Sequence, residues 1–240
     1  MAGDEAAKAK SKDDIRDRII DTALQMIAEK GWAETTSEAV IEAAGVSDKD
    51  FYAEFDGLLS VVVAASRRVN AAMMDAKAEF DPDDSPRDKL FALIMARFDA
   101  AEPWRKAIGE LNRAAPRDPV LAAAAGQMLT QTAALALEAA GIDTRGPLGF
   151  ARTNAFMVGV LWPAARAWIR DDTPDRSKTM AELDRCLARA EKLANWFGPL
   201  AGAPGSGEEK RAQAPSAADE ESAPGAGTTP GTDPKGATDG

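Results

Sequence analysis

The sequence contains no histidine, and this absence narrows the chemistry that the protein can perform. Histidine is the commonest general base and the commonest nitrogen ligand of metal ions in proteins. The one cysteine, Cys186, lies in an apolar helical pattern that favours a buried small residue over a nucleophile. The sequence also has no glycine-rich phosphate loop, and the acids Asp171, Asp172 and Asp175 stand between two predicted helices, where capping explains them. We therefore expect no enzyme, cofactor or metal site.

Signals for export or for membrane insertion are also missing. One cysteine cannot form an internal disulfide, and the opening stretch MAGDEAAKAKSKDD is polar throughout, so we expect a cytoplasmic protein. Residues 120–137 carry no charge, but alanine dominates them and four polar residues lie in their middle: Gln127, Thr130, Gln131 and Thr132. This composition favours a closely packed interior helix, and we expect no stable membrane insertion.

Positive charge is scarce. The chain has 29 Lys and Arg against 39 Asp and Glu, which gives a net charge of −10 and a pI of about 4.7. A protein that binds nucleic acid is expected to carry a basic stripe. Part of the acidity comes from residues 200–240, where Gly, Pro, Ala, Ser, Thr and acids occur without apolar periodicity and predict a disordered tail. This tail either competes for the basic residues of the N-terminus or only increases solubility.

Residues 35–44 predict a short helix followed by a sharp turn. Thr35 can cap this helix, with Glu38 three residues later to complete a capping box. Gly45 follows its last apolar residue, and a glycine at that position takes the left-handed conformation without a side-chain clash. Val46 is then expected to turn inward.

A second short helix follows the glycine turn. Ser47 can cap it with Asp50 at the third helical position, and Phe51 and Phe55, four residues apart, share one face. Two short helices joined by a tight glycine turn form a helix-turn-helix.

The region from Ile20 to Phe55 resembles the N-terminal DNA-binding domain of the tetracycline-repressor (TetR) family. The resemblance rests on separated motifs in register: AEKGW at 28–32, TT at 35–36, EAAGVS at 42–47 and FYAEF at 51–55. It implies an all-α fold with a three-helix DNA-binding domain and a larger helical domain for ligand binding and dimerisation. It further implies a regulator, a repressor by expectation, that binds a palindromic double-stranded operator as a homodimer and is released by a small apolar ligand.

The resemblance places the DNA contacts on the helix-turn-helix. The expected residues are Thr36, Ser47, Asp48, Lys49, Asp50 and Tyr52, and an aspartate can accept a hydrogen bond from cytosine N4. Family members usually begin the next helix with a phosphate-binding lysine, but residues 56–60 read DGLLS. Asp48, Asp50, Glu54 and Asp56 accompany a single cation, Lys49, so an alternative is a helix-turn-helix that no longer binds DNA.

The chain divides into four predicted parts. A flexible arm (1–12) precedes the DNA-binding domain (13–57), whose first helix is expected to begin at Asp13, and a helical ligand-binding and dimerisation domain (58–199) precedes the tail (200–240). Helices of the third part are expected at 58–80, 86–101, 103–115, 120–137, 147–170 and 174–196, with a bend at Pro163. In the family, the last two helices of each subunit pack against those of the other subunit, and this four-helix bundle is the dimer seam.

Aromatic residues and methionines of the middle helices are the candidates for an apolar ligand pocket. They are Phe91, Met95, Phe98, Trp104, Met128, Phe156, Met157 and Trp162. For each of them singly, core packing is the favoured interpretation, and only as a set do they suggest an apolar ligand.

A second resemblance supplies an alternative function. Residues 168–194, WIRDDTPDRSKTMAELDRCLARAEKLA, are similar to the closing segment of TetR-fold accessory proteins of ubiquinone biosynthesis, which bind lipids or isoprenoids and do not bind DNA. A third alternative is a helical scaffold that binds another protein through its N-terminal domain and its tail.

Overall fold

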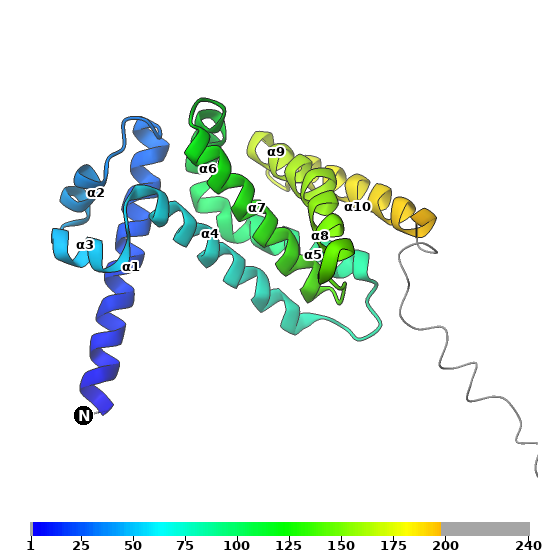
Figure 1. The fold of residues 1–240 in the computed structure, drawn as a ribbon, viewed down its shortest axis with the longest axis horizontal. Coiled ribbons are helices and arrows are strands. Elements are labelled where there is room, and N and C mark those ends of the chain that lie inside the picture. Colours follow the sequence, from blue (N-terminus) through cyan, green and yellow to red (C-terminus); the bar gives the residue numbers. More distant parts are fainter. Residues whose placement is uncertain (1, 198–240) are drawn as a thin grey trace, which may run out of the picture. The chain divides into compact units, whose positions relative to one another are not determined.

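A computed structural model describes residues 2–197 of the chain, with side chains described for residues 12–193. These residues form helices and no strand (Figure 1), as the all-α prediction required. The α-helices are α1 (Ala2–Lys30), α2 (Ser37–Ala44), α3 (Asp48–Glu54), α4 (Leu58–Asp75), α5 (Pro86–Ala101), α6 (Arg105–Ala114), α7 (Pro119–Ala139), α8 (Gly146–Phe156), α9 (Trp162–Arg170) and α10 (Ser177–Phe197). Short 3-10 turns η1 (Ala76–Glu79), η2 (Glu102–Trp104) and η3 (Ala115–Arg117) and a π-helical turn η4 (Met157–Leu161) lie between them. The predicted tail, 200–240, lies outside the described residues.

Helices α1 to α3 form an N-terminal domain with its own apolar core. Ile19, Ala23 and Ile27 of α1 are fully buried against Val40 of α2 and Phe51 of α3. Helix α1 begins at Ala2, whereas the sequence predicted a start at Asp13. The intervening stretch is rich in alanine and lysine and contains no proline, so its helix propensity lets the helix extend through the predicted arm.

Helix α4 belongs to two cores at once. Its first half packs Val61 and Val62 into the core of the N-terminal domain. Its second half packs Val69 and Met73 into a larger core built by α5, α7, α8, η4, α9 and α10, which together form the C-terminal domain. Any shift of α4 against the C-terminal domain therefore reaches the N-terminal domain.

Pro163 lies just after a change in helical geometry, in the region where the sequence predicted a bend. Proline has no backbone N–H to donate to the preceding turn. The chain takes a wider π-helical turn over Met157–Leu161, directly before α9. Such turns relieve a missing bond within an otherwise continuous helix.

Helix α7 is the helix of the described region that is long and apolar enough to cross a membrane, with a mean hydropathy of 1.4 over its best window. It buries Thr132, Ala133, Ala136 and Leu137 in the structure. A core helix of a globular domain passes the same test of length and composition. Only 28% of that window is buried, so one face of α7 packs into the core, and the prediction of an interior helix holds for that face alone.

Candidate nucleic-acid interface

Helix α2 begins one residue later than the sequence predicted. Thr36 is its N-cap, and the Thr36 hydroxyl accepts a hydrogen bond from the backbone N–H of Ala39 at 3.2 Å. Thr35, the predicted cap, is buried and donates instead to the carbonyl of Gly31 at 2.8 Å. Either of two adjacent threonines can cap a helix, and the burial of Thr35 decides between them. Thr36 remains exposed at the start of the helix.

The turn between α2 and α3 has the predicted glycine geometry. Gly45 adopts φ 62° and ψ 39°, the left-handed conformation that other residues rarely take. Its N–H donates to the carbonyl of Glu42, and the N–H of Val46 donates to that of Ile41, at 3.2 and 3.3 Å. These bonds satisfy the last carbonyls of α2 and fix the angle between the two helices.

The start of α3 is fixed by the predicted pair of Ser47 and Asp50. The Ser47 hydroxyl accepts a hydrogen bond from the backbone N–H of Asp50 at 3.1 Å and donates to its carboxylate at 2.7 Å. The bonds confirm Ser47 as the N-cap and occupy one oxygen of Asp50.

Helix α3 has one buried face and one exposed face. Phe51 is 0% exposed and Phe55, which follows the helix, is 3% exposed, whereas Tyr52 is 55% exposed. The other predicted contact residues of this segment are also exposed: Ser47, Asp48, Lys49 and Asp50. The structure therefore gathers five of the six predicted contact residues on one surface, formed by α3 and its cap.

Glu54 does not lie on that surface, although the sequence analysis counted it with the acids that oppose Lys49. Its side chain is 8% exposed, and its carboxylate lies 2.8 Å from Lys12 Nζ and 3.1 Å from Arg16 Nη1. Burial raises the pKa of Glu54, but hydrogen bonds and charge pairing with Lys12 and Arg16 lower it by more. One acid of α3 is thus neutralised by α1, a pairing that the sequence analysis missed.

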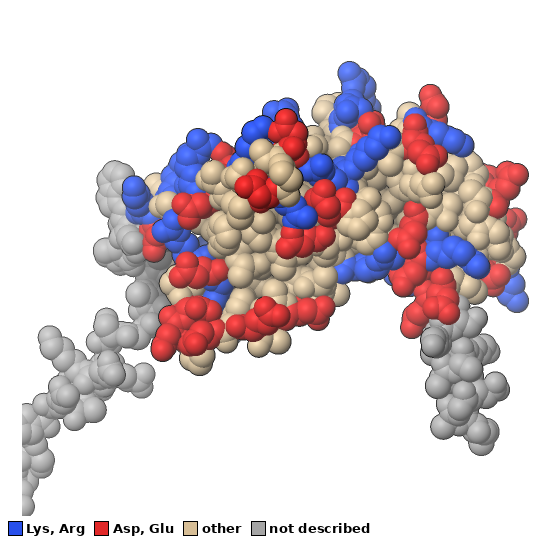
Figure 2. All heavy atoms as spheres, turned by 180° about the vertical axis from the view of Figure 1, so that it is seen from behind, with Lys and Arg blue, Asp and Glu red and all other residues tan. Residues whose placement is uncertain are grey.

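The segment after α3 offers no cation. The backbone N–H of Gly57 donates to the Ser60 hydroxyl at 3.2 Å, and that hydroxyl donates to the Gly57 carbonyl at 2.7 Å. Asp56 is exposed beside this turn. Positive and negative side chains are interspersed on the face seen in Figure 2, and its described atoms form no continuous basic stripe.

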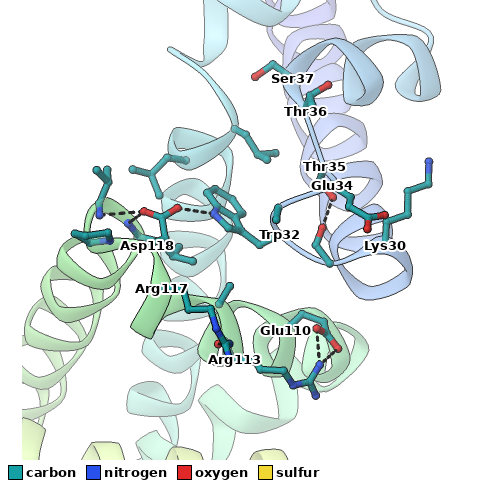
Figure 3. Close-up of a pocket in the computed structure, with 18 residues that line it drawn as sticks. Lys30, Trp32, Glu34, Thr35, Thr36, Ser37, Glu110, Arg113, Arg117 and Asp118 are labelled. Atoms are coloured by element: carbon teal, nitrogen blue, oxygen red, sulfur yellow. Dashed lines mark hydrogen bonds and ion pairs between the residues drawn. The ribbon is translucent and has the colours of Figure 1, made fainter.

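A groove of about 870 Å³ lies where the loop before α2 faces α6 and the start of α7. Trp32 points from this loop toward Asp118 (Figure 3), and its Nε1 donates to the Asp118 carboxylate at 2.8 Å. Asp118 also caps α7 by accepting from the N–H groups of Val120 and Leu121, both at 3.0 Å. Hydrogen bonds from Leu121 and from Trp32 lower the pKa of Asp118, so the contact is charge-assisted at neutral pH.

The predicted ligand residues line neither of the two cavities described below. Six of them pack in or against the core of the C-terminal domain: Phe91, Met95, Phe98, Trp104, Phe156 and Met157. Met128 packs against the other core, and Trp162 is 40% exposed on the outside. Neither the groove nor a second, smaller cavity at residues 138–145 is lined by any of the eight. No cluster of potential metal ligands occurs among the residues described.

Comparisons with known proteins agree with this geometry. The model of a family described as "Bacterial regulatory proteins, tetR family" matches residues 19–57. The chain is similar to the HTH-type transcriptional regulator BetI of Stenotrophomonas maltophilia (strain R551-3), with 32% identity over 92 residues, which is 36% of this chain and 45% of that protein. The match thus spans less than half the length of BetI. The chain is also 32% identical over 114 residues to the uncharacterized HTH-type transcriptional regulator TtgW of Pseudomonas putida, which covers 46% of this chain and 79% of that protein.

Solved structures show the same fold. A TetR transcriptional regulator from Nitrosomonas europaea ATCC 19718 matches with a TM-score of 0.59 and 21% identity, over 74% of this chain and 98% of that one. A TetR transcriptional regulator from Rhodococcus sp. RHA1 matches with a TM-score of 0.53 and 15% identity, over 74% and 96% of the two chains. Together with the helix-turn-helix geometry, these similarities show that the chain belongs to the tetR family of bacterial transcriptional regulators.

Proposed function

We propose that the protein is a homodimeric repressor that binds a palindromic operator and leaves it when a small molecule occupies the C-terminal domain. The observation that carries this proposal is the division of α3 into two faces. Phe51 and the paired Glu54 fasten one face to the N-terminal domain, while Lys49 and Tyr52 stand free on the other. A short helix fixed in this way presents its exposed side chains to the major groove of DNA.

The exposed residues of the helix-turn-helix supply both kinds of DNA contact. Lys49 and Tyr52 can reach phosphates and base edges, and Asp48 can accept from cytosine N4. The caps at Thr36 and Ser47 begin two helices whose first N–H groups attract a phosphate. The acidic residues beside the DNA major groove leave little non-specific attraction between the protein and DNA. The affinity for the operator therefore has to come from specific contacts.

An exposed apolar face supports dimerisation through α8 and α9. Phe150 is 68% exposed and Val158 is 62% exposed, and Trp162 follows Val158 by one helical turn. The small residues Ala155 and Gly159 are exposed on the same stretch and permit close approach of a second helix. A patch of this kind marks an interface between proteins.

The relatives named above are regulators, which favours DNA binding over the lipid-binding alternative. We propose that the protein acts in the cytoplasm, where its operator lies. Release by a ligand would proceed through α4, because this helix carries residues of both cores.

The test is a selection of sheared genomic fragments on purified protein, at low and at moderate salt. We expect one short palindrome, with an affinity that falls as salt rises. Lys49→Ala and Tyr52→Ala should each lose operator affinity by about tenfold or more, because each removes a contact to DNA. Lys106→Ala is the matched control, since it removes an exposed lysine of α6 and should bind as the wild type does.

Recovery of no fragment above background at low salt would refute operator binding. Unchanged affinity in both the Lys49 and the Tyr52 variant would refute the proposed contacts while leaving operator binding intact.

A further inference from the structure

Arg97 occupies a core-facing position of α5. The buried residues of this helix recur at helical spacing, with Leu90 6%, Ile94 0% and Ala101 0% exposed. Arg97 follows Ile94 by three positions and precedes Ala101 by four, so it shares their face of the helix. A charged side chain at such a position is costly unless it is paired, and it therefore requires a physical explanation.

The protein does not pair Arg97 with an acid. The side chain makes one hydrogen bond, from its Nε to Asn70 Oδ1 of α4 at 3.0 Å. Within residues 12–193, no carboxylate lies within 4.0 Å of its guanidinium and its two terminal nitrogens have no hydrogen-bond partner. The Arg97 charge is thus present without a counter-ion from the described chain.

Asn70 and Thr132 form a small polar group with Arg97. Asn70 Oδ1 also accepts from the Thr132 hydroxyl of α7 at 3.1 Å, a hydroxyl that donates alternatively to the Met128 carbonyl at 2.9 Å. Because guanidinium is a donor only, the oxygen of Asn70 must face Arg97, which turns the Asn70 amide N–H groups elsewhere. No partner is found for these N–H groups among the described residues. Two nitrogens of Arg97 and one of Asn70 therefore have no hydrogen-bond acceptor among the described residues.

These nitrogens are not sealed from solvent. Arg97 and Asn70 both retain partial accessibility, and neither is among the sealed side-chain atoms that lack a partner in the described part of the chain. Burial nevertheless lowers the pKa of Arg97 to about 10, which leaves it protonated at neutral pH. A surrounded cation with accessible nitrogens is what an internal binding site for an anion requires.

The surroundings of this polar group are apolar. Val69 and Met73 of α4, Leu93 of α5 and Ala133 of α7 are buried in the adjoining core, and Met95 packs partly buried against it. A ligand that reaches Arg97 therefore lies next to an apolar core.

We propose that Arg97 and Asn70 bind the head group of an amphipathic monocarboxylate whose apolar part enters the core of the C-terminal domain. The inference rests on the proposed function, in which this domain binds a ligand, and it names the chemical class. A guanidinium with two free terminal nitrogens matches the two oxygens of a carboxylate. A single cation neutralises one negative charge, which favours a carboxylate over a phosphate dianion.

One part of the proposed site lies on α4, the helix that carries residues of both cores. Asn70 is on α4, twelve residues after Leu58, which corresponds to about 18 Å along the helix axis. A carboxylate that draws Arg97 and Asn70 together would move α5 against α4, and α4 carries this shift to the N-terminal domain.

The test is calorimetric titration of purified protein, without DNA, with straight-chain monocarboxylates from acetate to decanoate. The primary alcohol and the alkyl phosphate of each length serve as comparison ligands. We expect saturable binding of at least one carboxylate, about tenfold to hundredfold tighter than the matched alcohol and tighter than the phosphate. Arg97→Met should lose this preference, whereas Arg67→Met, an exposed arginine on α4, should keep it.

Melting temperatures show whether the variants fold. Without ligand, Arg97→Met should melt at or above the wild-type temperature, because it removes an unpaired buried charge. Asn70→Asp supplies a carboxylate from the protein itself, so it should raise the melting temperature and abolish binding of the added carboxylate.

Three results would overturn the proposal: no saturable binding of any carboxylate, equal binding of carboxylate and alcohol, or an Arg97→Met protein that keeps its preference. Tighter binding of the phosphate would overturn the carboxylate class. These readouts use no DNA, so failure of operator binding in the fragment selection is scored separately from failure at Arg97.

Discussion

Two acids of α3 stand in opposite electrostatic surroundings. Glu54 is almost buried and contacts Lys12 and Arg16, while Asp48 is exposed and forms no ion pair among the described residues. Their substitutions remove the same charge from the same helix. The two positions thus separate the role of a carboxylate in folding from its role at the DNA surface.

We expect Glu54→Gln to lower the free energy of unfolding by about 1 kcal/mol, a value reduced from that of a buried pair because both cations are partly exposed. Asp48→Asn should change it by less than about 0.5 kcal/mol. Asp48→Asn should instead raise the non-specific affinity for duplex DNA without the operator at low salt, since it removes a charge that repels phosphates. Urea unfolding and DNA titration measure the two effects. Equal destabilisation by both variants would contradict the assignment of Glu54 to folding and of Asp48 to the DNA surface.

Sequence reasoning predicted some of these residues and missed others for identifiable reasons. The capping pair Ser47 and Asp50 is local, so its residue types and spacing predict it. The partner of Glu54 comes from α1, 38 positions away, and depends on how α1 crosses α3. Arg97 was a readable signal, because its spacing from Ile94 and Ala101 places a cation on a core face. The eight ligand residues, chosen by residue type, line neither of the two described cavities, and their role stays a prediction.

At the scale of helices, local start and stop signals predicted most boundaries. Helix α5 begins at Pro86 and Gly45 ends α2, as expected from the sequence, and Ser85 caps α5. The start of α1 was wrong because a helix with no breaker extends until its propensity fails, and no cap marks Asp13. Thr35 was the wrong cap because burial, which is a tertiary property, selects between adjacent threonines.

The turn between α9 and α10 is held by Asp171, which is 2% exposed. Its carboxylate accepts from the backbone N–H and the hydroxyl of Thr179, at 2.8 and 2.6 Å, and likewise from those of Thr173. Burial raises the pKa of Asp171, but these hydrogen bonds lower it well below its usual range.

We expect Asp171→Asn to lower the free energy of unfolding by about 1–3 kcal/mol at pH 7, because amide nitrogen cannot accept the bonds that one carboxylate oxygen receives. The pKa of Asp171 is lower in the folded state than its ordinary value of 3.8. Its contribution is therefore complete above pH 3.8 and is lost as the pH falls below that value. Unfolding measured from pH 7 to pH 2 should show the wild type and the variant converging in acid. A difference that stays constant with pH would contradict this role.

At the scale of the molecule, the exposed apolar face of α8 and α9 determines the expected oligomeric state. Val158→Asp places a charge in the proposed seam and should convert the dimer to a monomer, because an unpaired charge would be buried there. Val120→Asp is the matched control, since Val120 is 65% exposed at the start of α7. Sedimentation velocity measures both variants. A wild type that is monomeric at micromolar concentration, or a dimeric Val158→Asp protein, would refute the seam.

Besides the apolar packing of α4 and α6 against the core of the N-terminal domain, two sets of polar contacts join this domain to the rest of the described chain. In one, Trp32 donates to Asp118. In the other, Arg68 of α4 binds Asp17 and Asp21 of α1, at 3.0 and 2.8 Å, with its guanidinium 4.3 Å from the ring centre of Trp104. The ion pairs are partly exposed and individually weak. Together with the Trp32 hydrogen bond and the contact between Arg68 and the Trp104 ring, they connect the same two domains.

We expect the wild type to unfold in one calorimetric transition, because these contacts couple the two cores. The double variant Trp32→Phe with Arg68→Met should show two transitions, with the smaller core of the N-terminal domain melting first. Each single variant should lower the free energy of unfolding by about 0.5–1.5 kcal/mol. Arg87→Met breaks ion pairs to Asp184 and Glu191 within the C-terminal domain, so it should keep the single transition. One sharp transition in the double variant would mean that the apolar packing of α4 and α6 is enough to couple the domains.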